Sequence, residues 1–224
     1  KDKLGTEALP LALLDEGTKT RDALQIASEQ ERLGASIGAG ATLDRSSVTL
    51  FALKANLAPS LDLMADITRN PAFKPADVER LRVQLLAGIA AEETEPRGMA
   101  RRLLPSLIYG VEHPYGVPPS GRGTTAGVKA VTRDDLIAFH QTWLRPDNAK
   151  IFVTGDITMA ELLPLLNARF GDWAKPARPK GEKVFAAPRV EARPRIVLLD
   201  HPQSPQSYIM AGELLPGRGG DDPL

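Results

Sequence analysis

The stretch from Lys1 to Ala27 reads K-D-K-L-G-T-E-A-L-P-L-A-L-L-D-E-G-T-K-T-R-D-A-L-Q-I-A. Its apolar residues predict a helix from about Thr6 to Leu14, which Gly17 ends. Pro10 falls inside this span. Because proline has no N–H, it is tolerated only in the first turn of a helix, so this helix must either start late or bend.

The same stretch resembles the opening helix of the insulinase/pitrilysin-type zinc peptidases, the inverzincins, whose signature is H-x-x-E-H. In that family a G-x-x-H-x-x-E-H segment precedes a G-T-K-x-R turn, and here Gly5 and the run G-T-K-T-R from Gly17 match that frame. The resemblance places the two metal-binding histidines at Ala8 and Ala12 and the catalytic glutamate at Leu11. An alanine methyl has no lone pair for zinc, and a leucine cannot act as a base.

The third zinc ligand of the family, a glutamate on another helix, is also missing. The family segment is similar to E-R-x-x-V-x-x-E-E-I. Glu79 and Arg80 match its start and Ile89 matches its end, with one more residue between them here, and Gly88 stands at the ligand position just before the isoleucine. We therefore expect no catalytic residue and no metal ligand in this chain. A glycine inside a helix costs about 1 kcal/mol relative to alanine, and the close approach of another helix would explain it.

Composition excludes several other classes of protein. The chain has 224 residues, of which 42% are apolar and 25% charged, and its formal net charge is zero. This balance is typical of a globular protein and gives no basic excess for nucleic acid. Without cysteine, neither a disulfide framework nor a thiolate metal site can form. No apolar run is long enough to span a membrane.

The hydrophobic pattern predicts alternating helices and strands along the rest of the chain. The second helix should be capped by Thr18 or Thr20 and ended by Gly34, with Leu24, Ala27 and Leu33 facing the core. A strand with apolar residues on both faces is expected to be central in its sheet. The predicted helices are Arg21 to Leu33, Asn56 to Asn70, Lys74 to Glu93, Gly98 to Tyr109, Thr132 to Trp143 and Thr158 to Phe170, and the predicted strands are Ala35 to Thr42, Ser46 to Lys54 (the central one) and Ala149 to Gly155.

The first of these strands is rich in small residues. In the peptidase family a strand similar to G-G-x-x-N-A-x-T pairs with the peptide substrate, and the resemblance assigns that role to Ser36, Ile37, Gly38 and Ala39. Gly38 replaces the family's usual asparagine. Two other interpretations stay open, a glycine-rich strand packed under a helix and a contact with another chain.

The remaining polar candidates favour structural roles. The histidines are His113, His140 and His201, and no pair has the four-residue step of a helical metal site. We expect a loop hydrogen bond for His113, in the family-typical H-P-Y-G, a half-buried helix position for His140 and a turn for His201. Glu92 shares a helix face with Gly88, but we expect it to belong to a solvated helix end.

The chain divides into three parts by composition. We expect residues 1–173 to form a first peptidase-like domain, and the resemblance implies strands before its first helix that are missing here. Residues 174–194 contain four prolines between charged residues and predict a linker. We expect residues 195–224 to begin a second, truncated α/β domain, with strands at Arg195 to Leu199 and Gln206 to Gly212, and we expect further chain to complete it, because an isolated strand pair is marginally stable.

The resemblance implies an α/β (α+β) metallopeptidase sandwich, a mostly antiparallel sheet covered by helices on one side. Its first functional implication is a non-catalytic half that partners an H-x-x-E-H half and helps to enclose and bind extended peptides. Zinc would then belong to the catalytic half, and the family's arginine–tyrosine pair would follow Leu224. The alternatives are a purely structural core-protein-like subunit or, less favoured, an active zinc metalloendopeptidase. By analogy, the protein would be exported to the bacterial periplasm.

Overall fold

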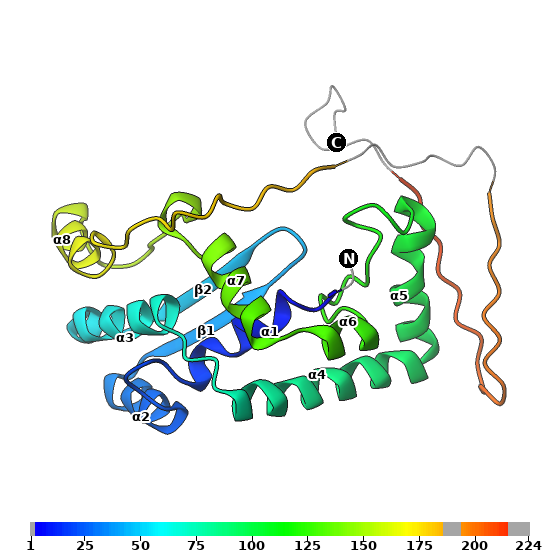
Figure 1. Ribbon diagram of the computed structural model, residues 1–224, viewed down its shortest axis with the longest axis horizontal. Coiled ribbons are helices and arrows are strands. Elements are labelled where there is room, and N and C mark those ends of the chain that lie inside the picture. The colour runs from blue at the N-terminus through cyan, green and yellow to red at the C-terminus, as the bar shows by residue number, and fades with distance from the viewer. Residues whose placement is uncertain (1–2, 186–193, 215–224) are drawn as a thin grey trace.

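The structure is a computed structural model that describes residues 3–185 and 194–214 (Figure 1). Its two strands are β1 (Ser36–Ala41) and β2 (Ser46–Phe51), and short 3₁₀ turns lie at Leu14–Glu16, Lys54–Asn56 and Pro146–Asn148. The helices are α1 (Ala8–Ala12), α2 (Ala23–Leu33), α3 (Leu57–Arg69), α4 (Pro75–Thr94), α5 (Pro96–Tyr109), α6 (Thr125–Ala130), α7 (Arg133–Trp143) and α8 (Met159–Phe170).

The sheet is an antiparallel hairpin whose register runs from Ser36↔Phe51 to Ala41↔Ser46. Side chains alternate between its faces, so one face packs against α1 and α3 while the other stays open. The inward face consists of Ile37, Ala39, Ala41, Val48 and Leu50, which join one apolar cluster. The predicted class is confirmed, a mixed α/β fold whose antiparallel sheet carries helices on one side.

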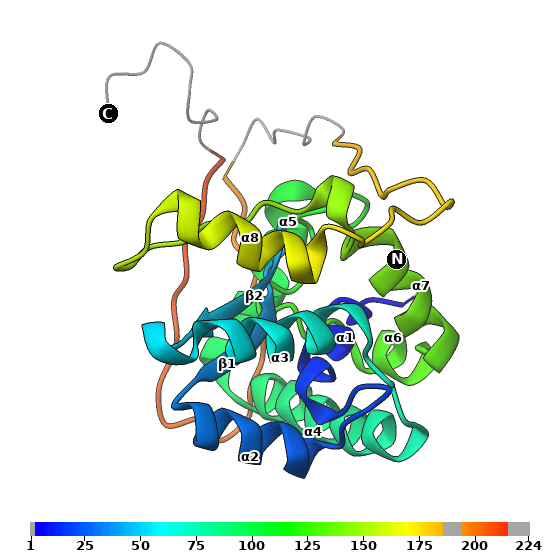
Figure 2. The same ribbon diagram turned by 90° about the vertical axis from the view of Figure 1, so that its left-hand side faces the viewer.

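Helices with strong local signals form where the sequence predicts them. Pro75 opens α4, where the missing N–H of proline costs nothing. Thr132 and Thr158 cap α7 and α8, each in a reciprocal hydrogen-bonded box with an acidic residue three positions later. The last of these helices lies beside α3 (Figures 1 and 2), and the Arg69 guanidinium donates to the carbonyl of Arg169.

The first helix is shorter than predicted. α1 starts at Ala8 rather than Thr6, which puts Pro10 in its first turn, and a 3₁₀ turn replaces its predicted last residues. Of the two predicted solutions, a late start or a bend, the chain adopts the late start. A proline in the first turn removes no hydrogen bond of the helix, because the N–H groups of that turn have no partner within it.

The cap and the core stripe predicted for α2 were wrong. Asp22 caps this helix through a capping box with Gln25, because the Thr18 hydroxyl instead donates to Asp66. Leu24 is 76% exposed and Ala27 is also exposed, whereas Ile26 is buried. The buried face of α2 is rotated by about one residue relative to the predicted face, and of the residues predicted to face the core only Leu33 is buried.

Several predicted strands are extended but unpaired. Within the described residues β2 pairs only with β1, so it is an edge strand and not the predicted central one. No ladder forms at Ala149 to Gly155, Arg195 to Leu199 or Gln206 to Gly212 in the part of the chain that is described. A strand needs a neighbour for its backbone N–H and C=O groups, which local sequence cannot supply. Phe152 and Ile209 are accordingly 85% and 89% exposed.

The predicted linker is fixed near its beginning. The Arg145 guanidinium is buried, pairs with Asp147, and donates to the carbonyls of Pro176 and Arg178. Beyond it, residues 186–193 of the linker and 215–224 of the second unit lie outside the described residues, and residues 194–214 run along α5 (Figure 1). The division of the chain into two domains stays a prediction.

Candidate functional site

Two of the positions that the resemblance assigns to metal ligands, Ala8 and Ala12, lie on α1, which packs between the sheet and α4 (Figure 1). Leu9 and Leu13 of α1 pack in one apolar cluster with Ile89 of α4. Leu11 lies on the opposite flank of the helix, in the cluster that contains Ile37 of β1. The helical repeat therefore places the remaining face, that of Ala8 and Ala12, between α4 and β1.

Leu11, which the resemblance assigns to the position of the catalytic base, is part of the core. Leu11 is 1% exposed and shares its cluster with Leu14, Ile26, Leu63 and Ile67. Ala8 is half-buried and Ala12 is exposed. Of the three assigned positions on α1, therefore, only Ala8 and Ala12 lie outside the core, where a metal-binding side chain could act.

The third ligand position is covered by a cation. A Cβ on Gly88 would lie 3.1 Å from Nε and 3.4 Å from Cδ of Arg122. The backbone carbonyl of Arg122 in turn lies close to Gly5, one turn before Ala8. The predicted reason for Gly88, the approach of another helix, was wrong, because the group that comes close is the Arg122 side chain from the loop before α6.

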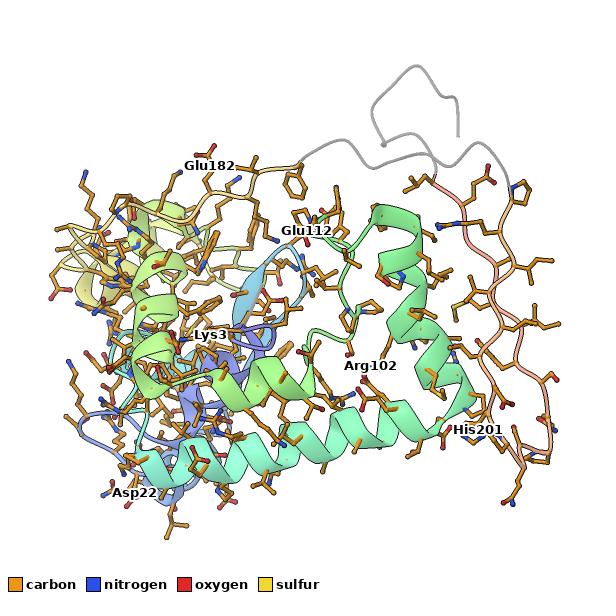
Figure 3. The ribbon with its side chains drawn as sticks, turned by 45° about the vertical axis from the view of Figure 1, so that its right-hand side comes forward. Lys3, Asp22, Arg102, Glu112, Glu182 and His201 are labelled. Atoms are coloured by element: carbon orange, nitrogen blue, oxygen red, sulfur yellow. The ribbon has the colours of Figure 1, made fainter. Side chains whose placement is uncertain are left out.

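Glu92 holds this arginine in place. Its carboxylate accepts hydrogen bonds from Arg122, from Arg102 at 2.7 Å and from Ser120 at 3.2 Å, and Figure 3 shows Arg102 in the angle between α4 and α5. Burial raises the pKa of Glu92, but these three donors outweigh it and the pKa lies below its ordinary value. The prediction of a solvated helix end was wrong for Glu92, whose side chain is only 19% exposed.

These residues do not fit zinc. The four assigned positions, Ala8, Leu11, Ala12 and Gly88, offer two methyl groups, a core leucine and a bare backbone. The charge nearest the third position is a guanidinium, which repels a metal cation. No group of three or more histidine or acidic residues that could hold a metal occurs in residues 3–185 and 194–214.

The free edge of β1 is the second element of the site. In an antiparallel pair, consecutive residues alternate between bonding the partner strand and facing away from it. The N–H of Thr42 donates to the carbonyl of Arg45, so Thr42 and Arg45 form a hydrogen-bonded pair. Every second residue before Thr42 is therefore also hydrogen-bonded to β2, which applies to Gly40, Gly38 and Ser36. Ile37, Ala39 and Ala41 therefore direct their backbone groups toward the free edge.

The assigned peptide-binding residues thus divide into two kinds. Ser36 and Gly38 use their backbone groups within the hairpin, while Ile37 and Ala39 face its free edge. The resemblance missed Ala41, which the two-residue period of the strand would have added. It also missed Gln30 of α2, whose side-chain carbonyl accepts the Ile37 N–H at 2.6 Å. No sequence signal links Gln30 to the strand.

The three histidines have the structural roles predicted for them. His113 Nδ1 accepts the Tyr115 N–H at 3.1 Å within the H-P-Y-G turn, and the Tyr115 hydroxyl donates to Asp44 at 2.8 Å. His140 is partly buried with Nε2 2.7 Å from the Thr68 carbonyl, and burial lowers its pKa. His201 belongs to a turn closed by the Ser204 N–H.

The G-T-K-T-R turn has a structural task of its own. Asp66 of α3 accepts hydrogen bonds from the Thr18 hydroxyl at 2.8 Å, the Thr20 hydroxyl at 3.1 Å, Asn70 and the Arg21 guanidinium. Burial raises the pKa of Asp66, but these donors together hold it below its ordinary value. The turn after α1 is thereby fixed to α3 without any metal chemistry.

We expect Asp66→Ala to lower the free energy of unfolding by about 2–3 kcal/mol, because hydrogen bonds to a charged acceptor are among the strong ones. The cost should shrink on acidification below pH ~4, since a carboxylate with a lowered pKa stabilises above its unfolded pKa and loses this effect as it protonates. Urea unfolding at several pH values measures both. Asp62→Ala, which removes an exposed ion pair with Arg169, is the control and should cost under about 1 kcal/mol. Equal losses for the two variants would contradict this role.

The fold is a mixed α/β domain, and the four positions that the resemblance assigns to metal ligands and base carry none of the required side chains. The family model described as Insulinase (Peptidase family M16) matches residues 10–114, and the model described as Peptidase M16 inactive domain matches residues 130–223. The chain belongs to the insulinase family of peptidases, M16.

Known proteins agree with this assignment. An uncharacterized zinc protease of Mycobacterium leprae is 27% identical over 206 residues, which cover 92% of this chain and 45% of that protein. The crystal structure of a peptidase M16 inactive domain from Pseudomonas fluorescens is 28% identical, with a TM-score of 0.75 over 84% of this chain and 45% of that one. The periplasmic protease PqqL of Escherichia coli shares the fold, with 20% identity and a TM-score of 0.70 over 84% of this chain and 21% of that one. The chain thus spans less than half the length of these relatives.

Proposed function

We propose that this chain is part of the non-catalytic half of an insulinase-family zinc peptidase and holds extended peptides at the free edge of β1. The observation that carries the proposal is the direction of the Ala39 and Ala41 backbone groups, which face an unpaired edge beside the ligand-free face of α1. A peptide that adds a strand to such an edge gains main-chain hydrogen bonds without any catalytic side chain.

The catalytic chemistry would belong to a partner. An H-x-x-E-H half, fused to this one or in a separate subunit, would bind zinc and activate water for attack on the peptide bond. The relatives support a larger assembly, because the M. leprae zinc protease is about twice as long as the region it shares with this chain. We also propose export to the periplasm, on the ground that PqqL is a periplasmic protease of the same fold. Among the described residues no helix combines the length and hydrophobicity needed to cross a bilayer.

A single proline tests the edge directly. Ala39→Pro removes an N–H that points away from β2, and proline is tolerated on edge strands where the lost N–H lies outside the ladder. We expect the complete protein, with cleavage stopped by a zinc chelator, to bind fluorescein-labelled oxidised insulin B chain at least about tenfold more weakly after this substitution. Fluorescence anisotropy measures the affinity.

The matched control is Ser46→Pro, which removes the corresponding N–H from the opposite edge of the same hairpin. It should leave peptide affinity unchanged, and both variants should unfold at nearly the wild-type denaturant concentration. If Ala39→Pro binds the peptide as well as wild type does, the edge is not the binding surface. If the unaltered complete protein binds no extended peptide, the purely structural core-protein-like subunit becomes the better account.

A further inference from the structure

The free edge of β1 is already occupied at one end. Gln30 lies in the last turn of α2, and its Oε1 accepts the N–H of Ile37 at 2.6 Å. The backbone carbonyl of the same residue accepts the N–H of Ala35 at 2.9 Å. Gln30 therefore fixes the connection from α2 to β1 through two hydrogen bonds. One of them uses the N–H of Ile37, a donor that an incoming strand would otherwise pair with.

Beyond Ile37 the edge is unoccupied. Ala39 and Ala41 have the same phase as Ile37, so their N–H and C=O groups leave the strand on the same side. Across the described residues, no hydrogen bond reaches the backbone of either alanine from that side. Two residues separated by one position are the smallest unit with which an extended peptide can form a regular ladder.

On the basis of the proposed function, we propose that Gln30 sets the end of the peptide-pairing edge, so that a bound peptide pairs with Ala39 and Ala41 and stops before Ile37. Gln30 is thus a positioning residue, because it occupies the N–H of Ile37 and does not contact the bond that is cleaved. The substrate class follows from the same geometry. The peptide must be extended and must carry free N–H groups where it faces Ala39 and Ala41, which excludes proline at those positions.

Residue-resolved amide hydrogen exchange on the chelator-treated complete protein tests this inference. Without peptide, the Ile37 amide should exchange slowly and those of Ala39 and Ala41 quickly. At saturating oxidised insulin B chain, the Ala39 and Ala41 amides should slow by at least about tenfold, and Ile37 should not change. In Gln30→Ala the Ile37 amide should exchange quickly without peptide and become protected when peptide is added, because the ladder can now extend by one step.

The control is Glu31→Ala, an exposed neighbour on the same helix, which should leave all three amides as in wild type. A role for Gln30 in stability alone would speed exchange at Ile37 without any protection by peptide, and that result would overturn the inference. So would a peptide that binds while Ala39 and Ala41 stay unprotected. Failure of the complete protein to bind peptide at all would instead reject the proposed function.

Discussion

Zinc is expected to bind more tightly at the assigned ligand positions when Arg122 is removed together with the restoration of the ligands. The variant Ala8→His, Ala12→His, Gly88→Glu restores the family ligand set on α1 and α4 but keeps the guanidinium that lies over position 88. The new carboxylate should then pair with Arg122 instead of a metal. Adding Arg122→Ala should raise zinc affinity at least about tenfold and yield about one additional bound zinc per chain.

Isothermal titration with zinc and metal analysis after dialysis measure the zinc gained relative to the unaltered complete protein. Arg101→Ala in the same three-ligand background is the matched control, because Arg101 is an exposed arginine on α5. Glu92 keeps Arg102 and Ser120 as partners when Arg122 is removed, so the fold around the site should survive. Equal zinc affinity with and without Arg122 would show that this cation does not guard the site, and no zinc in either variant would reject the assignment of the ligand positions.

Leu11→Glu, which restores the catalytic base of the family, is expected to destabilise the protein by more than about 4 kcal/mol. The substitution removes a leucine that is 1% exposed and places a carboxylate among the apolar residues around Ile37 and Ile67. Burial would raise the pKa of the new glutamate above its unfolded value. Its folded state would then be favoured by protonation, so the loss of stability should be smaller at pH 4 than at pH 8.

Unfolding in urea at both pH values, followed by circular dichroism, gives this loss. Leu24→Glu is the control, because Leu24 is 76% exposed and should change stability by no more than about 0.5 kcal/mol. Leu11→Gln separates the charge from the change of shape and should show no such dependence on pH. If Leu11→Glu were as stable as the control, the side chain of residue 11 would have to face solvent and not the core.

The sequence predicts those parts of the fold whose signals are local. A proline in the first turn indicated the start of α4, and threonine caps indicated the starts of α7 and α8. The cap of α2 was misassigned because the competing partner of Thr18 is Asp66, which is distant in sequence. Strand pairing was missed for the same kind of reason, since Phe152 has the residue type of a strand but no neighbouring strand among the described residues.

The candidate site shows the same limit. The spacing of Ala8, Leu11, Ala12 and Gly88 led to the prediction that the ligands and the base are absent, which stays a prediction. It could not show that Arg122 covers Gly88 or that Gln30 covers one donor of β1, because both contacts join elements that only the folded chain brings together. The edge residues Ile37 and Ala39 were assigned from the resemblance. The hairpin register directs both toward the free edge, and the hydrogen bond from Ile37 to Gln30 makes their availability unequal.

The burial of Leu11 also bears on how this lineage can evolve. A histidine pair on the open face of α1 is accessible through small changes, since Ala8 and Ala12 are not tightly enclosed. A glutamate at position 11 is not, because Leu11 is 1% exposed and its apolar neighbours would have to repack around a carboxylate. Metal affinity could therefore return through surface changes once Arg122 is lost, whereas a base at position 11 would require a rearranged interior, so selection would meet the interior as the obstacle to reversal.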